Sequence, residues 1–168
     1  VSSTEDKPFF LMASFPDPHH PFTPPGKYWD MYKPEDMEVP SSFDYGNVEP
    51  PPHVKWARDA RESGEAQTNS QNAFAVSERE ILEARALTCG MIAMIDDAVG
   101  DILKKLEDSG LAENTIVVFT ADHGDFLGDH GLMLKGPAHF ESVTRVPFIW
   151  SEPGAKSRAT DTLASTVD

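Results

Sequence analysis

Cysteine, basic side chains and long apolar runs are all scarce in this sequence. The single cysteine, Cys89, excludes a disulfide within the 168-residue chain. No run of about 18 apolar residues occurs, so the sequence contains no candidate membrane span. Lys and Arg number 14 against 28 Asp and Glu, for a formal net charge of −14. That balance argues against a nucleic-acid partner, which needs a basic surface. These absences indicate neither the compartment nor the oligomeric state.

The two ends lack the usual marks of a complete protein. The chain opens on V-S-S-T-E-D-K, without an initiator methionine or the layout of a signal peptide. It stops at T-L-A-S-T-V-D with no element that would close a domain. We therefore expect an internal piece of a larger protein, with any signal peptide in the missing N-terminal part. The content of 39% apolar and 25% charged residues is otherwise ordinary for a globular domain.

Three short apolar runs predict buried strands, at residues 9–15, 115–121 and 146–150. A helix is expected between the first two runs. Ser77 and Glu80 form a capping-box pattern, an apolar stripe at helical spacing follows, and Gly110 suits the helix end.

Prolines interrupt the polar stretch before this helix. We expect an irregular surface excursion over residues 33–76, with one helical turn near Trp56. Strand, excursion, helix and strand in this order favour an α/β fold, with helices flanking a mostly parallel sheet that is incomplete in this chain.

A polar, glycine-rich segment follows the second apolar run. It reads A-D-H-G-D-F-L-G-D-H-G-L-M-L-K-G, so the strand would deliver Asp122 and His123 at its carboxyl end. An Asp beside a His suits a divalent cation with oxygen and nitrogen ligands. Lys135 is close enough in sequence to return to the same place, whereas Asp125 is expected to stabilise the turn. The alternative is a simple turn with a capping Asp and an exposed His.

The loop after the first apolar run reads P-H-H-P-F and holds His19 and His20 between prolines. Ligands of open α/β sheets bind beyond the carboxyl ends of the strands, which is where this loop would lie. The alternative is a proline-rich turn with two surface histidines.

Together, and in this order, the segments resemble the sulfatase family of the alkaline-phosphatase-like superfamily. The matching pieces are P-H-H-P-F, I-D-D-A-V-G-D-I-L at 95–103, N-T-I-V-V-F-T-A-D-H-G at 114–124, G-D-H-G-L-M-L-K-G at 128–136 and F-E-S-V-T-R-V-P at 140–147. The resemblance implies that residues 1–168 are part of a catalytic domain. Its parts would be the strand and histidine loop (1–32), the excursion (33–76), and the helix, central strand, metal-ligand turn and following strand (77–168).

The resemblance also implies roles for single residues. Asp122 and His123 would bind the catalytic divalent metal, most often Ca²⁺, with Mn²⁺ or Zn²⁺ as alternatives. Lys135 and His19, in preference to His20, would contact the anionic ester group and act in catalysis. His130 and His139 are further candidates for substrate binding.

Two features of the family are missing. Sulfatases attack with a formylglycine made from a C/S-x-P/A-x-R motif, but Cys89 stands in T-C-G-M-I within the expected helix, where a small buried apolar role is expected. The paired N-terminal aspartates of the metal site are also absent. We therefore expect no nucleophile in this chain, and we expect it upstream.

The function implied is hydrolysis of sulfate esters, either small molecules such as aryl sulfates or sulfated glycans. A phosphonate or phosphate ester hydrolase of the same superfamily is the first alternative. A non-catalytic fragment is the second, and the chain by itself is expected to be inactive.

Overall fold

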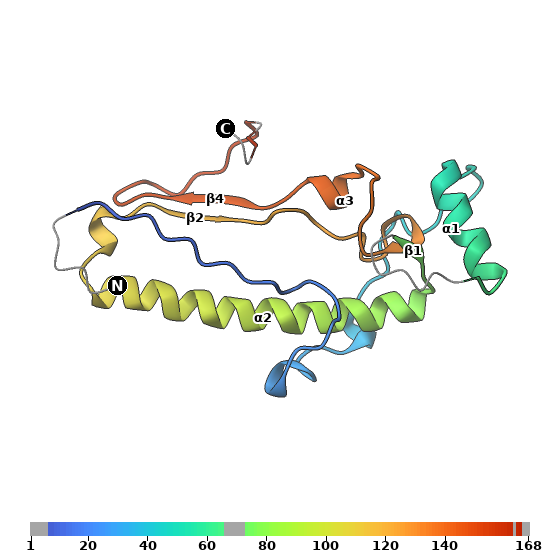
Figure 1. Cartoon of the computed structure of the whole chain (residues 1–168), viewed down its shortest axis with the longest axis horizontal. Helices are drawn as coiled ribbons and strands as arrows, with labels where there is room; N and C mark the ends of the chain where they lie inside the picture. The colour runs from blue at the N-terminus through green and yellow to red at the C-terminus, as the bar shows by residue number, and fades with distance from the viewer. Residues whose placement is uncertain (1–6, 66–72, 163, 166–168) are drawn as a thin grey trace.

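The computed structural model of the chain describes residues 7–65, 73–162 and 164–165. A long helix, α2 (Glu78–Asp108), runs the length of the molecule (Figure 1), and a ribbon of two strands, β2 (Val117–Thr120) and β4 (Phe148–Ser151), runs along it. The shorter elements are α1 (Pro52–Glu62), β1 (Phe74–Ala75), β3 (Leu132–Met133) and α3 (Glu141–Thr144). Short 3-10 turns are η1 (Gly26–Tyr28), η2 (Pro34–Asp36), η3 (Ala112–Asn114) and η4 (Asp129–Gly131).

The start of α2 has the capping box that the sequence predicts. The Ser77 hydroxyl accepts a hydrogen bond from the Glu80 amide at 3.4 Å, and the Glu80 carboxylate accepts one from the Ser77 amide at 2.7 Å. At the other end, Gly110 adopts a φ of 68° and its amide donates to the Glu107 carbonyl. The expected helix is therefore confirmed, including both of its ends. Cys89 lies within it and is half-buried.

Two of the three predicted strands form, and they pair with each other. β2 and β4 are antiparallel, with Val118 opposite Trp150, and β1 and β3 form a second antiparallel pair. The mostly parallel sheet that the sequence predicts does not form among the described residues. After β2 the chain folds back through β3 and α3, so β4 returns in the opposite direction. An apolar run indicates a strand but does not specify the direction of its neighbour.

The strand predicted at residues 9–15 is not formed. The segment is extended and runs in the same direction as β2 (Figure 1), but it pairs with no strand in the described part of the chain. Its side chains are exposed, Phe10 to 92% and Met12 to 77%. A buried strand needs partners at its edges and layers on both faces, and the described residues provide neither here.

Exposure of apolar side chains continues along the ribbon and the C-terminal half of α2. The large apolar residues exposed there include Ile92, Ile102, Leu103, Ile116, Val118, Phe119, Phe148, Ile149 and Trp150. Within the described ranges, no helix has the length and apolar character needed to cross a bilayer.

The described part of the segment 33–76 is more ordered than the sequence predicts, and residues 66–72 lie outside the described residues. Instead of one helical turn near Trp56, the helix α1 has 11 residues. Pro52 lies in its first turn, where a missing amide hydrogen removes no helical bond. Arg61, near the other end, pairs with Glu80 of α2 at 2.8 Å. This contact between helices lies outside the reach of a local pattern.

The packed core lies toward the end of the molecule where α2 begins. One cluster joins α1 to the turns after β2 and consists of Val54, Ala57, Ala75, Phe126, Leu132 and Val143. A second cluster packs the same turns against α2 and consists of Val76, Ile81, Ala84, Met133 and Leu134. Residues 126–134 are therefore held between two helices, and they connect the predicted metal-ligand turn to Lys135.

The capping box provides a test of how α2 begins. Ser77→Ala removes a side-chain acceptor from the first turn, so we expect the free energy of unfolding to fall by about 1 kcal/mol in urea denaturation. Arg79→Ala is the matched control, because Arg79 is largely exposed and its pairing with Glu83 at 3.0 Å is a surface ion pair, worth about 0.5 kcal/mol or less. Equal losses in the two variants would contradict a specific role of the cap.

Candidate active site

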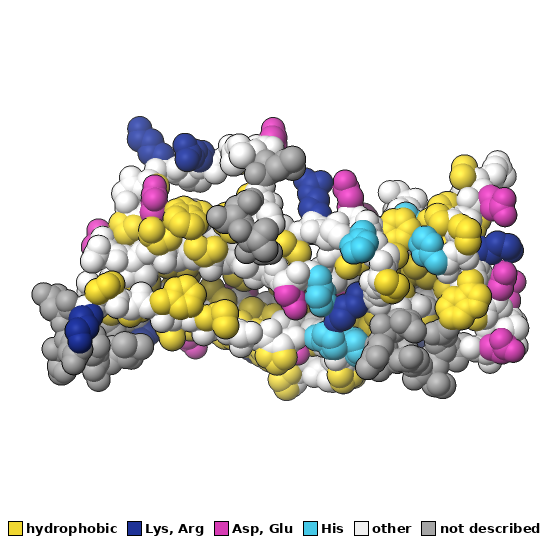
Figure 2. All heavy atoms as spheres, turned by 45° about the horizontal axis from the view of Figure 1, so that its top comes forward, with side chains coloured by type: hydrophobic (Ala, Val, Ile, Leu, Met, Phe, Trp, Pro, Cys, Tyr) yellow, Lys and Arg dark blue, Asp and Glu magenta, His cyan; other side chains and the backbone are white. Residues whose placement is uncertain are grey.

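The polar turns that follow β2 come together with the histidine loop of residues 18–22. In Figure 2 histidine side chains gather on one face of the molecule, with basic side chains among them. Most of the chain's charge is negative, since its formal net charge is −14. A concentration of imidazole and ammonium groups on one face of such a chain is the local environment that an anionic ligand requires.

Asp122 and His123 present two ligand atoms side by side. The Asp122 Oδ2 atom and the His123 Nε2 atom are 3.6 Å apart. The His123 Nδ1 atom lies 2.8 Å from the Gly124 carbonyl, to which it can donate, so that tautomer leaves a lone pair on Nε2. The Asp122 Oδ1 atom accepts from the His123 amide at 2.9 Å. Both side chains are exposed and point their remaining atoms outward together.

This pair fits part of a metal site. A carboxylate oxygen and an imidazole nitrogen are donors that divalent cations accept. No group of three or more His, Cys, Asp or Glu that could hold a metal ion forms among the described residues. The pair therefore offers donor types that suit a cation, and the described residues complete no coordination shell around it.

Gly124 allows this turn to pack directly on α3. Its amide donates to the Val143 carbonyl at 2.8 Å. A Cβ atom on Gly124 would lie 2.0 Å from the Ser142 carbonyl oxygen. The backbone contact that orients His123 therefore requires glycine at this position.

Asp125 closes a hairpin of residues 126–134 that leads from this turn to Lys135. Its Oδ1 atom accepts from the amides of Leu127 and Leu134, both at 3.0 Å. Burial raises the pKa of Asp125, while these two hydrogen bonds and the charge of Lys135 act in the opposite direction. The turn-stabilising role that the sequence predicts for Asp125 is confirmed.

The histidine loop approaches the same hairpin through His20. Burial lowers the pKa of His20, the charges of His19 and Lys135 lower it further, and Asp125 raises it. The P-H-H-P-F loop and the hairpin meet, because Phe22 packs against the core cluster that contains Met133 and Leu134. The His20 Nδ1 atom is buried and has no hydrogen-bond partner among the residues that the structure describes.

His19, which the sequence favours over His20, lies at the exposed side of this group. Its ring stacks on that of His20 with centroids 4.0 Å apart, and its Nδ1 atom lies 2.7 Å from the His20 carbonyl. Sequence reasoning gives His20 the smaller role, and His20 is the half-buried member of the pair. Nothing in two adjacent histidines tells which one faces inward, because that depends on the packing of the loop.

The other two candidates differ in their surroundings. His139 is exposed. His130 is half-buried at the tip of the hairpin, and its Nδ1 atom lies 2.8 Å from the Tyr45 hydroxyl. Burial lowers the pKa of His130, and Asp129 raises it. Tyr45 is a residue that the sequence analysis does not single out, and it comes from the segment expected to be irregular.

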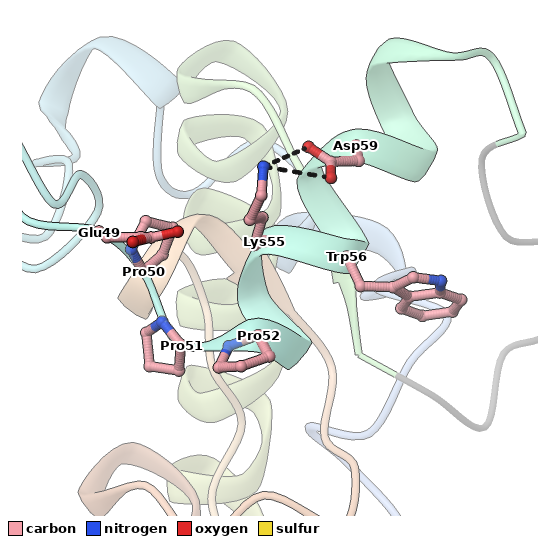
Figure 3. Close-up of a pocket in the computed structure, with 7 residues that line it drawn as sticks. All are labelled: Glu49, Pro50, Pro51, Pro52, Lys55, Trp56 and Asp59. Atoms are coloured by element: carbon pink, nitrogen blue, oxygen red, sulfur yellow. Dashed lines mark hydrogen bonds and ion pairs between the residues drawn. The ribbon is translucent and has the colours of Figure 1, made fainter.

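An open hollow lies elsewhere, at the start of α1 (Figure 3). Its lining consists of Glu49, Pro50, Pro51, Pro52, Lys55, Trp56 and Asp59. Lys55 and Asp59 pair within it at 3.4 Å, and the Trp56 indole points away from the prolines. None of the predicted site residues lines this hollow, so the candidate site is the exposed group of residues around Lys135.

Solved structures with a similar fold indicate the class of protein. The chain superposes on a phosphonate monoester hydrolase of Agrobacterium radiobacter with a TM-score of 0.68 and 25% identity, over 90% of this chain and 30% of that one. It superposes on a putative sulfatase of Bacteroides thetaiotaomicron with a TM-score of 0.55 and 29% identity, over 73% of this chain and 25% of that one. The fold is thus part of the alkaline-phosphatase-like fold of these neighbours.

The family follows from the sequence comparison. The family model described as Sulfatase matches residues 1–168, and the chain belongs to the sulfatase family. It is 38% identical to an arylsulfatase of Clostridium perfringens, over 88% of this chain and 28% of that protein. It is 35% identical to the multifunctional alkaline phosphatase superfamily protein PehA of Trinickia caryophylli, over 95% of this chain and 31% of that protein. The chain therefore spans less than a third of the length of these relatives.

The contact at Gly124 leads to a prediction for the metal-ligand turn. Gly124→Ala should force the turn away from α3, lowering the free energy of unfolding by about 1–3 kcal/mol and displacing His123. Urea denaturation measures the first effect, and His123 chemical shifts report the second. Gly100→Ala is the control, because a Cβ at this position in α2 meets nothing within 4 Å. A Gly124 variant as stable as the control would show that the turn is not confined.

Proposed function

We propose that the whole protein hydrolyses sulfate esters, of small molecules or of sulfated glycans, and that residues 1–168 form part of its catalytic domain. Membership of the sulfatase family is the observation that carries this proposal, and it rests on a match along the full chain. The gathering of Asp122, His123, His20 and Lys135 around the hairpin supports it. The parts of the domain would be those given by the sequence, residues 1–32, 33–76 and 77–168.

Asp122 and His123 would hold a divalent metal ion, and Ca²⁺ is the ion we favour over Mn²⁺ or Zn²⁺. When bound, such an ion draws negative charge from the ester oxygens. The role of the protein is to keep the Asp122 carboxylate and the His123 Nε2 atom available to the metal. The hydrogen bond from His123 to the Gly124 carbonyl keeps the Nε2 lone pair available, and the Asp122 carboxylate is oriented by the next amide along the chain.

Lys135 and His19 would act on the ester group itself. An ammonium at the end of the closed hairpin can donate hydrogen bonds to sulfate oxygens and stabilise charge on the leaving oxygen. His19 uses its Nδ1 atom within the loop, which leaves Nε2 to contact the same group. The nucleophile, a formylglycine in this family, would come from outside this chain.

The first alternative is hydrolysis of phosphonate or phosphate esters. The similarity to a phosphonate monoester hydrolase and to PehA favours it over other classes. Both reactions need a metal and cations around a tetrahedral anion, so the residues described here do not distinguish them.

Assay of the whole protein tests this assignment. We expect turnover of an aryl sulfate to exceed that of a phosphonate monoester measured in parallel, and preference for the phosphonate would reverse the assignment. Lys135→Ala should lower turnover of the aryl sulfate by about 100-fold or more, because it removes a charge that stabilises the transition state. Lys104→Ala, at an exposed lysine of α2 that pairs with Asp108 at 3.0 Å, is the control and should keep full activity.

Cation binding by the isolated chain is a further prediction. With only Asp122 and His123 as ligands, calorimetry should detect weak binding of Ca²⁺ or Mn²⁺, or none, because Ca²⁺ takes about six to eight ligands. The whole protein should bind one equivalent tightly, and Asp122→Ala should abolish that binding. Tight stoichiometric binding by the isolated chain would disprove the incomplete site.

A further inference from the structure

Four ring side chains meet at the tip of the hairpin and form what we call the ring cluster, Tyr45, His53, His130 and Phe140. The His130 and Phe140 rings are 4.1 Å apart between centroids, and His130 is 5.5 Å from Tyr45. His53 of α1 lies 5.5 Å from Phe140 on the other side. His53 is exposed and the other three are half-buried, so the cluster packs on the core below and opens to solvent above.

His130 occupies a backbone conformation that few side chains adopt. Its φ is 60° and its ψ is 17°, in the left-handed region, where a residue other than glycine is strained by about 1–3 kcal/mol. Neighbours hold it there. The His130 amide donates to the Ser42 carbonyl at 3.0 Å, and Arg58 donates to the His130 carbonyl at 3.4 Å. Such residues occur where the surroundings over-determine the backbone, often at functional sites.

The imidazole of His130 is oriented as firmly as its backbone. Its Nδ1 atom is engaged by the Tyr45 hydroxyl at 2.8 Å, and its face rests on Phe140. The Nε2 atom has no hydrogen-bond partner in the part of the chain that the structure describes. The Nε2 atom of His130 is therefore available for a hydrogen bond to a ligand, beside the partly exposed rings of the cluster. Burial lowers the pKa of this side chain.

The ring cluster lies on the same hairpin that leads to Lys135. The hairpin is closed by backbone hydrogen bonds from Phe126 to Leu134 and from Gly128 to Leu132, both at 2.8 Å. His130 lies at its tip and Lys135 follows its base, so their Cα atoms are at most about 17 Å apart at the rise of an extended chain. The cluster also adjoins the metal-ligand turn, because Phe140 caps α3 and the Val143 carbonyl of α3 accepts from the Gly124 amide at 2.8 Å.

We propose that the ring cluster binds the ring of the alcohol part of the substrate, a pyranose or an aryl group, with His130 Nε2 hydrogen-bonded to a ring substituent. This inference rests on the proposed function, which assigns the sulfate group to Lys135. The flat side chains of the cluster favour stacking against the face of a ligand ring. The Arg58 guanidinium lies 5.4 Å from the centre of the Tyr45 ring. Its positive charge disfavours a cationic alcohol. A short acyclic alcohol would not reach the cluster.

Substitutions of His130 can separate function from folding. His130→Gly removes the imidazole but suits the left-handed backbone, so the variant should fold. His130→Asn tolerates the same backbone and restores a hydrogen-bonding group. Tyr45→Phe keeps the packing and releases the Nδ1 atom. Val48→Ala is the control, an exposed residue of the same segment outside the ring cluster. Thermal denaturation of the whole protein verifies that each variant is folded.

The assay compares two primary alkyl esters, galactose 6-sulfate and ethyl sulfate, with 4-nitrophenyl sulfate as the aryl arm. For whichever ring ester the wild type prefers, we expect His130→Gly to lower kcat/KM about tenfold. This is the effect expected from losing one hydrogen bond together with its ring contact. His130→Asn should restore part of the lost kcat/KM, and Tyr45→Phe should lower kcat/KM by less than His130→Gly does. Turnover of ethyl sulfate and inhibition by inorganic sulfate should remain unchanged in all variants.

Failure of this inference and failure of the proposed function give different results. Equal losses for ring and ethyl esters in His130→Gly, or no loss for any ester, would overturn the ring cluster as a subsite. If the wild type hydrolyses none of the sulfates, the proposed function fails. Saturation-transfer NMR with galactose and 4-nitrophenol then decides the inference separately. Binding of either ring that His130→Gly weakens supports it, and binding of neither overturns it.

Discussion

The two hydrogen bonds that Asp125 accepts are the interaction on which the arrangement of the site depends. One carboxylate oxygen joins the amides of Leu127 and Leu134, and so ties the start of the hairpin to its end. The turn with Asp122 and His123 precedes this junction and Lys135 follows it. A half-buried carboxylate satisfied by two amides is costly to disturb, because either amide left unpaired would carry its own desolvation penalty. The two functional segments are thereby held at one place.

The rest of the packing supports this junction. α1 and the start of α2 enclose the hairpin through Phe126, Leu132 and Leu134, which are nearly inaccessible to solvent. Arg85 of α2 donates to the Leu127 carbonyl at 3.1 Å and Arg58 of α1 to the Phe43 carbonyl at 2.9 Å. Long helices therefore act here as supports for a short glycine-rich turn. Much of the remaining ribbon exposes its apolar side chains, so the best-packed part of the chain is also the part that carries the candidate site.

Charge is distributed in the same way. The chain is strongly acidic, but histidine side chains gather on one face with basic side chains among them. Burial lowers the pKa of His20 and of His130, so these two side chains are weaker bases than an exposed histidine. A histidine side chain can donate or accept a hydrogen bond. That combination suits recognition of an anion joined to a polar organic group.

Local chemistry in the sequence was enough to determine the capping box of α2, its end at Gly110, the strands at 117–120 and 148–151, and the turn that presents Asp122 and His123. Each of these depends on neighbouring residues or on a regular apolar period. Tertiary packing alone decided the antiparallel pairing of β2 with β4, the exposure of residues 9–15 and the full length of α1. It also decided that His20 is the more buried of the two adjacent histidines and that Tyr45 meets His130. These contacts join segments far apart in the chain, and their free energy comes from burial that no local pattern contains.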